Sequence, residues 1–326
     1  MDTKALPDFT LRVPHLEEAG AVADLINAAS LEDVGAPHTW PEHVRSDWTE
    51  PEHSLDDDSR VVEAEDGRLA ACLDFYGEPP FTHLASYAYV HPDFRGRGLG
   101  SLLLDFVEAR GNVVAAASAV EGQRVGLVSW MWKPNHSAVE LHKARGYSYV
   151  RSFYDMLIEM ETPPPTPRWA DGITVRTFER GKDERATFAV DKEAFKDHWG
   201  HSDHSFETWI HAMIEANDRF DPSLFFLACE GDKLVGLTLG RKGTPEDPNM
   251  LWVDDMAVLR PWRRRGVALA LLHQLFGEAY AREVRRIGLD VDAQSNTGAV
   301  GLYEKAGMRV WREGVAYEKV IRSGSE

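Results

Sequence analysis

The sequence of 326 residues is poor in cysteine and contains no long apolar run. Its two cysteines, Cys72 and Cys229, exclude a disulfide framework and a four-cysteine zinc site by number alone. Each lies in a short apolar run, so we expect both to be small buried hydrophobic residues of a reducing compartment. No stretch approaches the roughly 18–20 apolar residues that cross a bilayer. These absences predict a protein without disulfides or membrane spans.

Positive charge is also scarce, with 36 Lys and Arg against 53 Asp and Glu and a formal net charge of −17. This sign disfavours nucleic acid and anionic membranes as partners, and it favours a cationic small molecule such as a primary amine. Solubility alone explains the charge equally well. The N-terminal sequence MDTKALPDFT lacks a basic segment followed by an apolar one, so we expect a cytoplasmic protein rather than a secreted one.

The most informative feature that is present is an internal duplication. Residues 135–147 match residues 296–308 without a gap, and Asn, Ala, Val, Leu and Gly recur at the same five places. A loop rich in arginine and glycine, residues 95–100, likewise matches residues 263–268. Each loop follows an apolar run and a proline, and each opens an amphipathic helical pattern. Two copies of one domain explain these matches.

A proline-rich stretch separates the two copies. Residues 161–171 contain Glu-Thr-Pro-Pro-Pro-Thr-Pro, which can form neither a helix nor a central strand. The sequence therefore predicts an N-terminal domain over 1–160, this linker, and a C-terminal domain over 172–326. An acidic stretch in the first copy, residues 50–66, is interpreted either as a solvated loop or as part of a rim that attracts cations.

Both copies show the same order of expected elements, a hairpin followed by strand, helix, strand and helix. Such a strand–helix–strand order implies a parallel strand pair, and therefore a mixed α/β domain made twice. The expected hairpins are 60–65 with 69–76 and 223–229 with 233–240, the helices after the loops are 99–110 and 268–279, and the strands after them lie near 125–129 and 287–291.

The two arginine- and glycine-rich loops indicate anion binding. Backbone N–H groups at a helix N-terminus are unpaired, the helix dipole favours negative charge there, and glycine lets a phosphate approach the backbone. The glycine spacing does not match a Rossmann fingerprint, and no Gly-Lys-Ser/Thr follows as in a P-loop. A tight turn with surface arginines would explain one loop, but two in the same context favour a phosphate site in each.

The pattern Arg-x-x-Gly-x-Gly/Ala after an apolar strand, followed 33–40 residues later by Asn-x-x-Ala, resembles the GNAT (GCN5-related N-acetyltransferase) superfamily. The resemblance covers nearly the whole chain, and its tandem layout is similar to that of mycothiol synthase-like actinobacterial acetyltransferases. It implies acetyl-CoA as cosubstrate and no metal. It also implies, in each domain, a mixed and mostly antiparallel sheet with a central splayed parallel pair flanked by helices. The implied splayed strands are 83–91 with 124–130 and 249–259 with 286–292.

In this family the loop amides hold the pyrophosphate of acetyl-CoA, and the splayed strands hold its pantetheine arm. By resemblance, the backbone of residues 256–258 would pair with the pantetheine amides and polarise the thioester carbonyl. Asn296 would hold the pantetheine or simply cap the following helix. The implied contact residues are Val90, Arg95, Gly96, Arg97, Gly98, Leu99, Gly100 and Asn135 in the first copy, and Met256, Ala257, Val258, Arg263, Arg264, Arg265, Gly266, Val267, Ala268 and Asn296 in the second.

The second copy also carries candidates for the chemistry of acetyl transfer. The amine must lose a proton before it attacks, and the leaving thiolate benefits from a proton donor. Asp254 and Asp255 lie where the family often places a general base, on opposite faces by alternation unless a bulge changes the phase. Tyr303 matches the tyrosine that the family uses to protonate the thiolate. Solvated carboxylates at a strand end and a packed tyrosine are the structural alternatives.

The first copy departs from this pattern, with Ser86 and Tyr87 at the aspartate positions and His142 at the tyrosine position. We expect it to be a degenerate domain that still binds acyl-CoA, although histidine can act as an acid or base. In the second copy, residues 198–204 with Phe206 and Trp209 would line the acceptor side. Three histidines in that segment, separated by glycine, do not have the spacing of a zinc site.

The sequence therefore predicts an N-acetyltransferase that moves an acetyl group to a primary amine by direct attack in a ternary complex. A covalent acyl-enzyme is not supported, because no Gly-x-Ser-x-Gly elbow is present and both cysteines lie outside the motifs. Two alternatives remain: a non-catalytic acyl-CoA-binding or scaffold protein, and an enzyme whose active site is in the first copy. The acceptor is a small-molecule or peptide amine, and mycothiol synthesis is one possibility.

Overall fold

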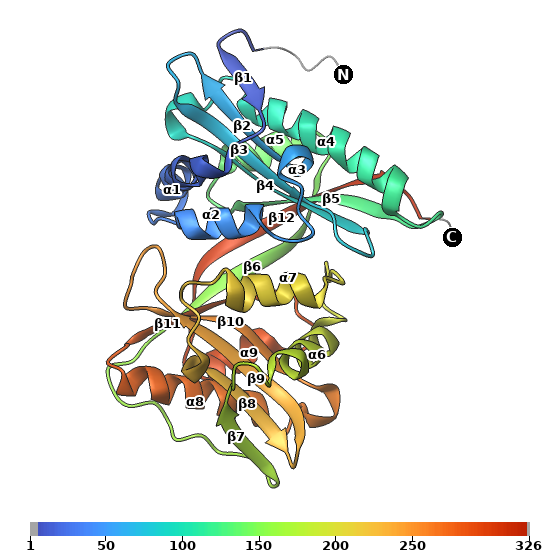
Figure 1. Cartoon of the computed structure of the whole chain (residues 1–326). Helices are drawn as coiled ribbons and strands as arrows, with labels where there is room; N and C mark the ends of the chain where they lie inside the picture. Colours follow the sequence, from blue (N-terminus) through green and yellow to red (C-terminus); the bar gives the residue numbers. More distant parts are fainter. Residues whose placement is uncertain (1–5, 325–326) are drawn as a thin grey trace. The chain divides into compact units, whose positions relative to one another are not determined.

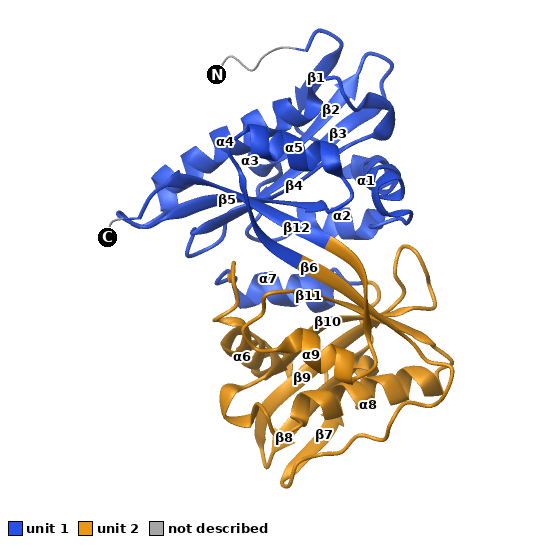
Figure 2. Ribbon diagram, turned by 180° about the vertical axis from the view of Figure 1, so that it is seen from behind, with its two compact units in different colours: residues 1–152, 202–217, 314–326 blue, residues 153–201, 218–313 orange. Residues whose placement is uncertain are grey.

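The computed structural model describes residues 6–324 and divides into two compact units (Figures 1 and 2). Unit 1 holds the chain as far as Ser152, together with 202–217 and the segment from Gly314 onward. Unit 2 holds 153–201 and 218–313. The predicted linker, 161–171, contains no helix or strand. The units are nevertheless not contiguous in sequence, which a division of the chain at that linker does not anticipate.

Unit 1 is a six-stranded sheet in the order β1-β2-β3-β4-β5-β12. All neighbours are antiparallel except β4 and β5, which are parallel. The strands are β1 (Phe9–Arg12), β2 (Ser59–Ala64), β3 (Leu69–Tyr76), β4 (His83–Val90), β5 (Val125–Trp132) and the last part of β12 (Arg309–Arg322). The helices are η1 (Leu16–Glu18), α1 (Ala19–Val34), α2 (Pro41–Trp48), α3 (Leu55–Asp58), η2 (Pro92–Phe94), α4 (Leu99–Ser118), α5 (His136–Ala144), α7 (Phe206–Ile210) and η3 (His211–Glu215).

Unit 2 repeats this sheet in the order β6-β11-β10-β9-β8-β7, with β10 and β11 as its parallel pair. The predicted fold class and the parallel pair in each copy are thereby confirmed. The strands are β6 (Ser148–Glu159, from Phe153 on), β7 (Ile173–Thr177), β8 (Phe225–Glu230), β9 (Lys233–Lys242), β10 (Leu251–Val258) and β11 (Arg286–Asp292). The helices are α6 (Glu184–Phe195), η4 (Pro222–Leu224), η5 (Arg260–Trp262), α8 (Val267–Ala281) and α9 (Ala299–Lys305).

Side chains that alternate along the strands of unit 1 pack into two different hydrophobic cores. Leu73 and Phe75 of β3 pack in a cluster with α4, whereas Cys72 packs with α1 and α2. The period of two along a strand explains this division. The apolar stripe predicted for residues 99–110 extends to the end of α4, because Val114 and Ala115 continue it. In unit 2, α8 packs in one large cluster with β10 and β11. Both cysteines are free and buried, as predicted.

The last strand of each sheet comes from the other half of the chain (Figure 2). In unit 1, β5 pairs with β12 from Gly314↔Trp132 to Arg322↔Val125. In unit 2, β11 pairs with β6 from Arg286↔Glu159 to Asp292↔Phe153. Each copy ends in a long strand that can satisfy either sheet edge, so the duplication alone does not indicate which partner it takes.

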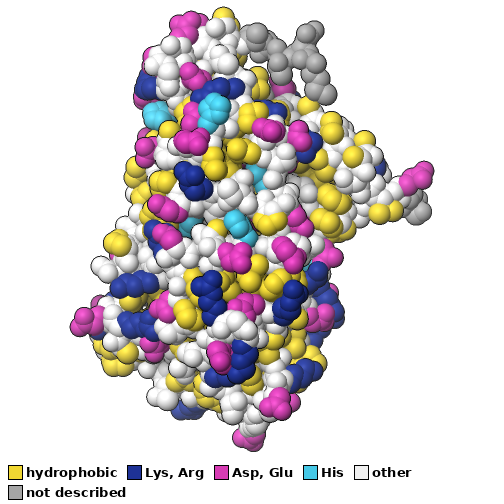
Figure 3. All heavy atoms as spheres, in the orientation of Figure 1, with side chains coloured by type: hydrophobic (Ala, Val, Ile, Leu, Met, Phe, Trp, Pro, Cys, Tyr) yellow, Lys and Arg dark blue, Asp and Glu magenta, His cyan; other side chains and the backbone are white. Residues whose placement is uncertain are grey.

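The acidic stretch of residues 50–66 is not only a solvated loop, because it contains α3 and β2. On the face shown in Figure 3, acidic side chains are interspersed with basic ones. None of the helices within residues 6–324 combines the length and the apolar composition that a bilayer crossing requires.

Candidate active site

The parallel strand pair opens in both units. In unit 2, β10 pairs with β11 only over residues 251–253, although it pairs with β9 as far as Val258. In unit 1, β4 pairs with β5 only over residues 83–86, although it pairs with β3 as far as Val90. Beyond each opening, one edge of β10 and of β4 lacks a strand partner. Its backbone groups are available to an extended ligand.

A loop at the N-terminus of a long helix follows each opening. Gly98 and Gly266 occupy the N-cap positions of α4 and α8 with φ of +87° and +83°. This left-handed conformation is accessible to glycine at little cost. No side chain caps either helix. A Cβ placed at Gly266 would meet no atom of the described chain within 4 Å, so the space on that side of the loop is open.

The loop arginines divide into two roles. The first arginine of each loop braces the fold: Arg95 forms an ion pair with Asp33 at 2.9 Å, and Arg263 donates to the carbonyl of Val258 at 2.9 Å. By contrast, Arg264 is exposed and forms no ion pair within residues 6–324. Of the predicted loop arginines in unit 2, Arg264 is therefore the best placed to meet an anion.

Strand β10 contains a bulge at Asp254. The pairing with β9 passes from Val253↔Gly240 directly to Asp255↔Leu239, which leaves Asp254 as the extra residue. The anticipated change of phase is therefore present in unit 2. Arg241 Nε donates to Asp254 Oδ1 at 2.7 Å. Sequence reasoning missed Arg241, and its place on β9 beside the bulge is visible only in the sheet register.

The opening is rich in carboxylates whose pKa values are raised. Limited solvation raises the pKa of Asp254, and the neighbouring Arg241 opposes this shift. The pKa of Asp255 is well above its usual range because of desolvation and then the charges of Asp191, Asp254 and Asp290. Desolvation followed by the charge of Asp254 also raises the pKa of Asp290, although its side chain remains solvent-accessible. Raised values make these carboxylates stronger bases near neutral pH.

Two aspartates lie opposite each other on neighbouring strands of unit 2, one from each copy in the sequence. Asp290 of β11 lies directly opposite Asp155 of β6. Desolvation and then the charge of Asp290 raise the pKa of Asp155 to about 7. Asp290 was missed because it occupies the outward position between the buried Leu289 and Val291, where a polar residue is ordinary. Asp155 was not predictable as a neighbour, because it belongs to the first copy in sequence.

Tyr303 lies with these carboxylates. It is on α9 and is only 7% exposed. Burial, followed by the charges of Asp290 and Asp255, raises the pKa of its hydroxyl. The structure thus brings together Asp254, Asp255 and Tyr303, the three residues predicted to be catalytic, and adds Asp290 to them.

The two motif asparagines differ from each other. Asn135 caps α5, where its Oδ1 accepts from the amide of Ala138 at 3.0 Å. Asn296 is exposed in a turn, and Gly298 occupies the N-cap of α9 instead. The expectation that Asn296 caps its helix is therefore wrong. The reason is local: α9 begins three residues beyond Asn296 rather than directly after it.

Unit 1 has different chemistry at the equivalent positions. The Ser86 and Ser129 hydroxyls lie 2.9 Å apart across the parallel pair, where unit 2 has Asp254 and Asp290. His142 Nδ1 lies 2.8 Å from the Ala138 carbonyl, and its ring packs edge-on against Tyr147. The residue is 8% exposed, and burial lowers its pKa. His142 is a packed side chain, and no bulge is present in the pairing of β4 with β3.

The predicted acceptor segment is divided between the units. Residues 198–201 belong to unit 2, but Phe206 and Trp209 lie on α7, which belongs to unit 1. That the segment lines an acceptor site stays a prediction, whereas Ser205 does cap the start of α7. His198 packs against Phe195 with ring centroids 4.5 Å apart. Within residues 6–324 no group of three or more His, Cys, Asp or Glu residues has the arrangement of a metal site.

A parallel pair that splays before the glycine N-cap of a long helix, made twice, is the arrangement expected of a tandem acyltransferase. The profile of the Acetyltransferase (GNAT) family matches residues 25–147 and 185–308. The chain belongs to this family, and it is an acetyltransferase.

Similar proteins support this classification. A mycothiol acetyltransferase of Thermobispora bispora is 32% identical over 252 residues, which cover 74% of this chain and 77% of the relative. Another, of Salinispora arenicola, is 29% identical over 315 residues, which cover 91% and 93%. The crystal structure of a GCN5-related N-acetyltransferase from Sphaerobacter thermophilus matches with a TM-score of 0.78 and 38% identity over 98% of both chains. A tandem GNAT protein from the clavulanic acid pathway shares the fold, with a TM-score of 0.66 and 15% identity over 97% of this chain and all of that one.

Proposed function

We propose that unit 2 transfers the acetyl group of acetyl-CoA to a primary amine by direct attack in a ternary complex. The observation that carries this proposal is the grouping of Asp254, Asp255, Asp290 and Tyr303 where β10 parts from β11. The glycine-rich loop follows this site along the chain. The thioester of acetyl-CoA would therefore lie near the carboxylates and Tyr303, and its phosphates would lie near the loop.

In the proposed reaction, a carboxylate of β10 takes a proton from the substrate ammonium group. The amine nitrogen then attacks the thioester carbonyl carbon, and the carbon–sulfur bond breaks as Tyr303 donates its hydroxyl proton to the leaving thiolate. The nitrogen loses its second proton, which restores the Tyr303 hydroxyl, and the carboxylate releases the first proton to solvent. Asp255 suits the role of base better than Asp254, because Asp254 already has a cationic partner in Arg241. The unpaired edge of residues 256–258 offers backbone groups to the pantetheine arm and the thioester oxygen.

Three groups would hold acetyl-CoA in unit 2: the α8 amides beyond Gly266, the Arg264 guanidinium and the free edge of β10. The equivalent loop and edge in unit 1 support acyl-CoA binding there as well. Unit 1 would bind without turnover, because Ser86 and the packed His142 supply neither a base nor an accessible acid.

The acceptor is an amine, and the names of the relatives make mycothiol synthesis the first place to search. The test therefore supplies acetyl-CoA with a panel of amines that includes mycothiol lacking its acetyl group. Release of coenzyme A thiol reports turnover, and the two cysteines of the chain are buried.

Tyr303→Phe tests the proposal. We expect kcat to fall by about 100-fold, with the affinity for acetyl-CoA changed by less than about threefold, because the hydroxyl acts only on the leaving group. Tyr280→Phe, a partly buried tyrosine on α8, is the matched control and should behave like the native chain. An unchanged kcat in Tyr303→Phe contradicts the assigned role. Acetyl-CoA binding without turnover of any amine would instead support the non-catalytic alternative.

A further inference from the structure

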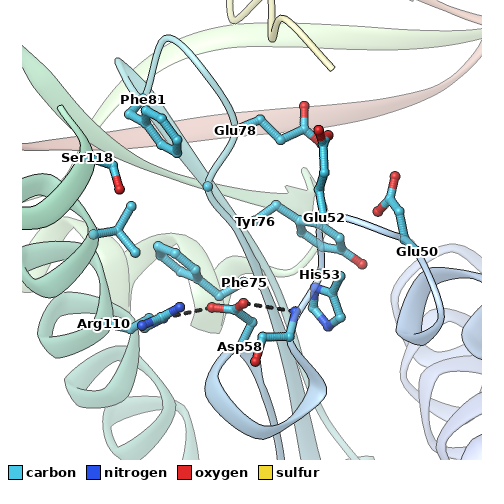
Figure 4. A pocket seen from close by; sticks show the side chains of 13 residues that line it. Glu50, Glu52, His53, Asp58, Phe75, Tyr76, Glu78, Phe81, Arg110 and Ser118 are labelled. Carbon is cyan, nitrogen blue, oxygen red and sulfur yellow. Dashed lines mark hydrogen bonds and ion pairs between the residues drawn. The ribbon is translucent and has the colours of Figure 1, made fainter. Parts of the chain in front are cut away.

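A cavity of about 200 Å³ lies in unit 1, between the C-terminal half of α4 and the chain around α3 (Figure 4). Glutamates 50, 52 and 78, the rings of Tyr76 and Phe81, and Arg110 are among the residues that line it. Neither the loop 95–100 nor the strand opening at Ser86 contributes to its wall within the described chain. The cavity is thus distinct from the acyl-CoA surfaces discussed above.

The cavity carries negative charge that the protein does not neutralise. Arg110 is the arginine in the wall, and it is already paired with Asp58 at 2.7 Å. His53 also lines the wall, and burial lowers its pKa. Glu50 and Glu78 have no ion pair or side-chain hydrogen bond within residues 6–324, and Glu52 accepts only from the Thr208 hydroxyl at 2.9 Å. Burial, followed by the charges of Glu78 and Glu52, raises the pKa of Glu50 to about 7. Like charges held around one hollow repel each other unless a cation joins them.

Aromatic and aliphatic side chains, Phe75, Tyr76, Phe81 and Val114, form another part of the wall, which also contains the polar His53, Ser54 and Ser118. Figure 4 shows the three glutamates and Tyr76 on one side of the hollow and the ring of Phe81 on the other. The ring faces of tyrosine and phenylalanine attract an organic cation, and Val114 adds apolar surface. Phe81 has a φ of +60°, a conformation that a non-glycine residue adopts only when its surroundings impose it.

A segment from the other half of the chain supports one side of this wall. The Asp203 amide donates to the Pro79 carbonyl at 2.6 Å, next to Phe81 in sequence, and Thr208 of α7 donates to Glu52. Glu52 and the backbone beside Phe81 are therefore held by contacts outside their own loops. Such positioning lowers the entropy that a ligand must overcome on binding.

We propose that this cavity binds a small organic ammonium ion. The carboxylates of Glu50 and Glu78 accept hydrogen bonds from the ammonium group, and its carbon chain lies against Phe81 and Val114. The volume corresponds to roughly six or seven water molecules, which suits a short alkyl or hydroxyalkyl amine. The aromatic rings and Val114 in the wall suit a carbon chain, which a bare metal ion lacks. The proposal is independent of catalysis in unit 2, because it requires neither acetyl-CoA nor Tyr303.

Calorimetric titration of the full chain with butylammonium chloride tests the proposal, with butan-1-ol as the neutral match. The titration is made in an Asp255→Asn background, so that an amine bound in unit 2 contributes little. We expect the ammonium ion to bind and the alcohol not to bind. The double change Glu50→Gln/Glu78→Gln should weaken binding by roughly tenfold or more, because two charge-assisted hydrogen bonds are lost. Glu65→Gln, an exposed glutamate in the turn after β2, is the matched control and should leave binding unchanged.

A second variant tests the need for free volume in the cavity without changing its charge. Ser118→Trp places a large ring at the cavity from an exposed position on α4 and keeps all three glutamates. It should abolish binding without changing the melting temperature. Binding that persists in both variants overturns the proposal. So does equal binding of butan-1-ol, or no binding of butylammonium by the parent chain.

Discussion

The two units share a fold and an anion loop, but they differ at the opening of the parallel strands. Gly98 and Gly266 have almost the same left-handed conformation at the head of α4 and α8. The strand before the loop is regular in unit 1 and bulged at Asp254 in unit 2. Serines 86 and 129 bond to each other where unit 2 holds aspartates. Backbone geometry that suits ligand binding is thus present in both units, whereas the strand opening holds carboxylates in unit 2 and hydroxyls in unit 1.

The two units also differ at the strand that each receives from the other copy, β12 in unit 1 and β6 in unit 2. In unit 1 the residue opposite Ser129 is Tyr317, and in unit 2 the residue opposite Asp290 is Asp155. The second pair places two carboxylates on neighbouring strands, which is unfavourable for stability. Unit 2 therefore carries an electrostatic cost at its site that unit 1 lacks, as is common where function requires perturbed groups.

Removing the exchanged strand from unit 1 should have the largest effect. A chain that ends at Glu313 loses the partner of β5, and with it the buried Val315, Ala316 and Tyr317. We expect unit 1 to lose its cooperative unfolding transition, because β5 becomes an open edge and its core loses one wall. Calorimetry and limited proteolysis measure this. A chain that ends at Arg322, the last residue of β12, is the control, and equal stability of the two truncations would contradict the exchange.

Valine in place of each loop glycine should have the next largest effect, and this effect should differ between the two units. Gly266→Val forces a β-branched residue into a left-handed conformation and fills the space at the α8 amides. We expect kcat/KM for acetyl-CoA to fall by about 100-fold, because the phosphate contacts of the catalytic unit are lost. Gly98→Val makes the same change in unit 1 and should alter turnover by less than about threefold. The opposite order would place catalysis in unit 1.

Asparagine at Asp155 should produce a smaller effect that depends on pH. The folded pKa of about 7 exceeds the unfolded value near 3.9, so the folded state binds more protons between these values. Stability of the native chain should therefore fall as pH rises from about 4 to about 7 and then level off. We expect Asp155→Asn to raise the melting temperature by about 2–4 °C at pH 8 and by little at pH 4. Tyr317→Phe in unit 1 should not change this pH dependence, and an equal gain at both pH values would contradict the assignment.

Local features of the fold were predictable from the sequence. The duplicated loops, the apolar stripes of α4 and α8, and the strand–helix–strand order all depend on residues close together in the chain. The prediction for β11, residues 286–292, agrees with its observed bounds. The family motif also indicated Asp254, Asp255 and Tyr303, which the structure brings together.

The remainder depends on contacts between distant segments. The exchange of β6 and β12 is not encoded in periodicity, because a terminal strand fits either sheet edge. The pairing of Asp155 with Asp290 follows from that exchange and was missed with it. The capping alternative for Asn296 is wrong because α9 begins at Ala299, a local difference from α5 that the matched residues of the two copies do not reveal. The assignment of α7 to unit 1 likewise depends on contacts between distant segments.

One comparison of double variants tests the central claim most directly. Asp254→Asn/Asp255→Asn removes the proposed base from unit 2 with little change in shape, and Ser86→Ala/Tyr87→Phe removes the equivalent polar groups from unit 1. Steady-state acetyl transfer and acetyl-CoA binding are measured for both. We expect the unit 2 variant to lose about 100-fold or more in kcat while it retains acetyl-CoA, and the unit 1 variant to stay within about threefold of the native chain. Loss of turnover in the unit 1 variant, with full activity in the unit 2 variant, would contradict the account.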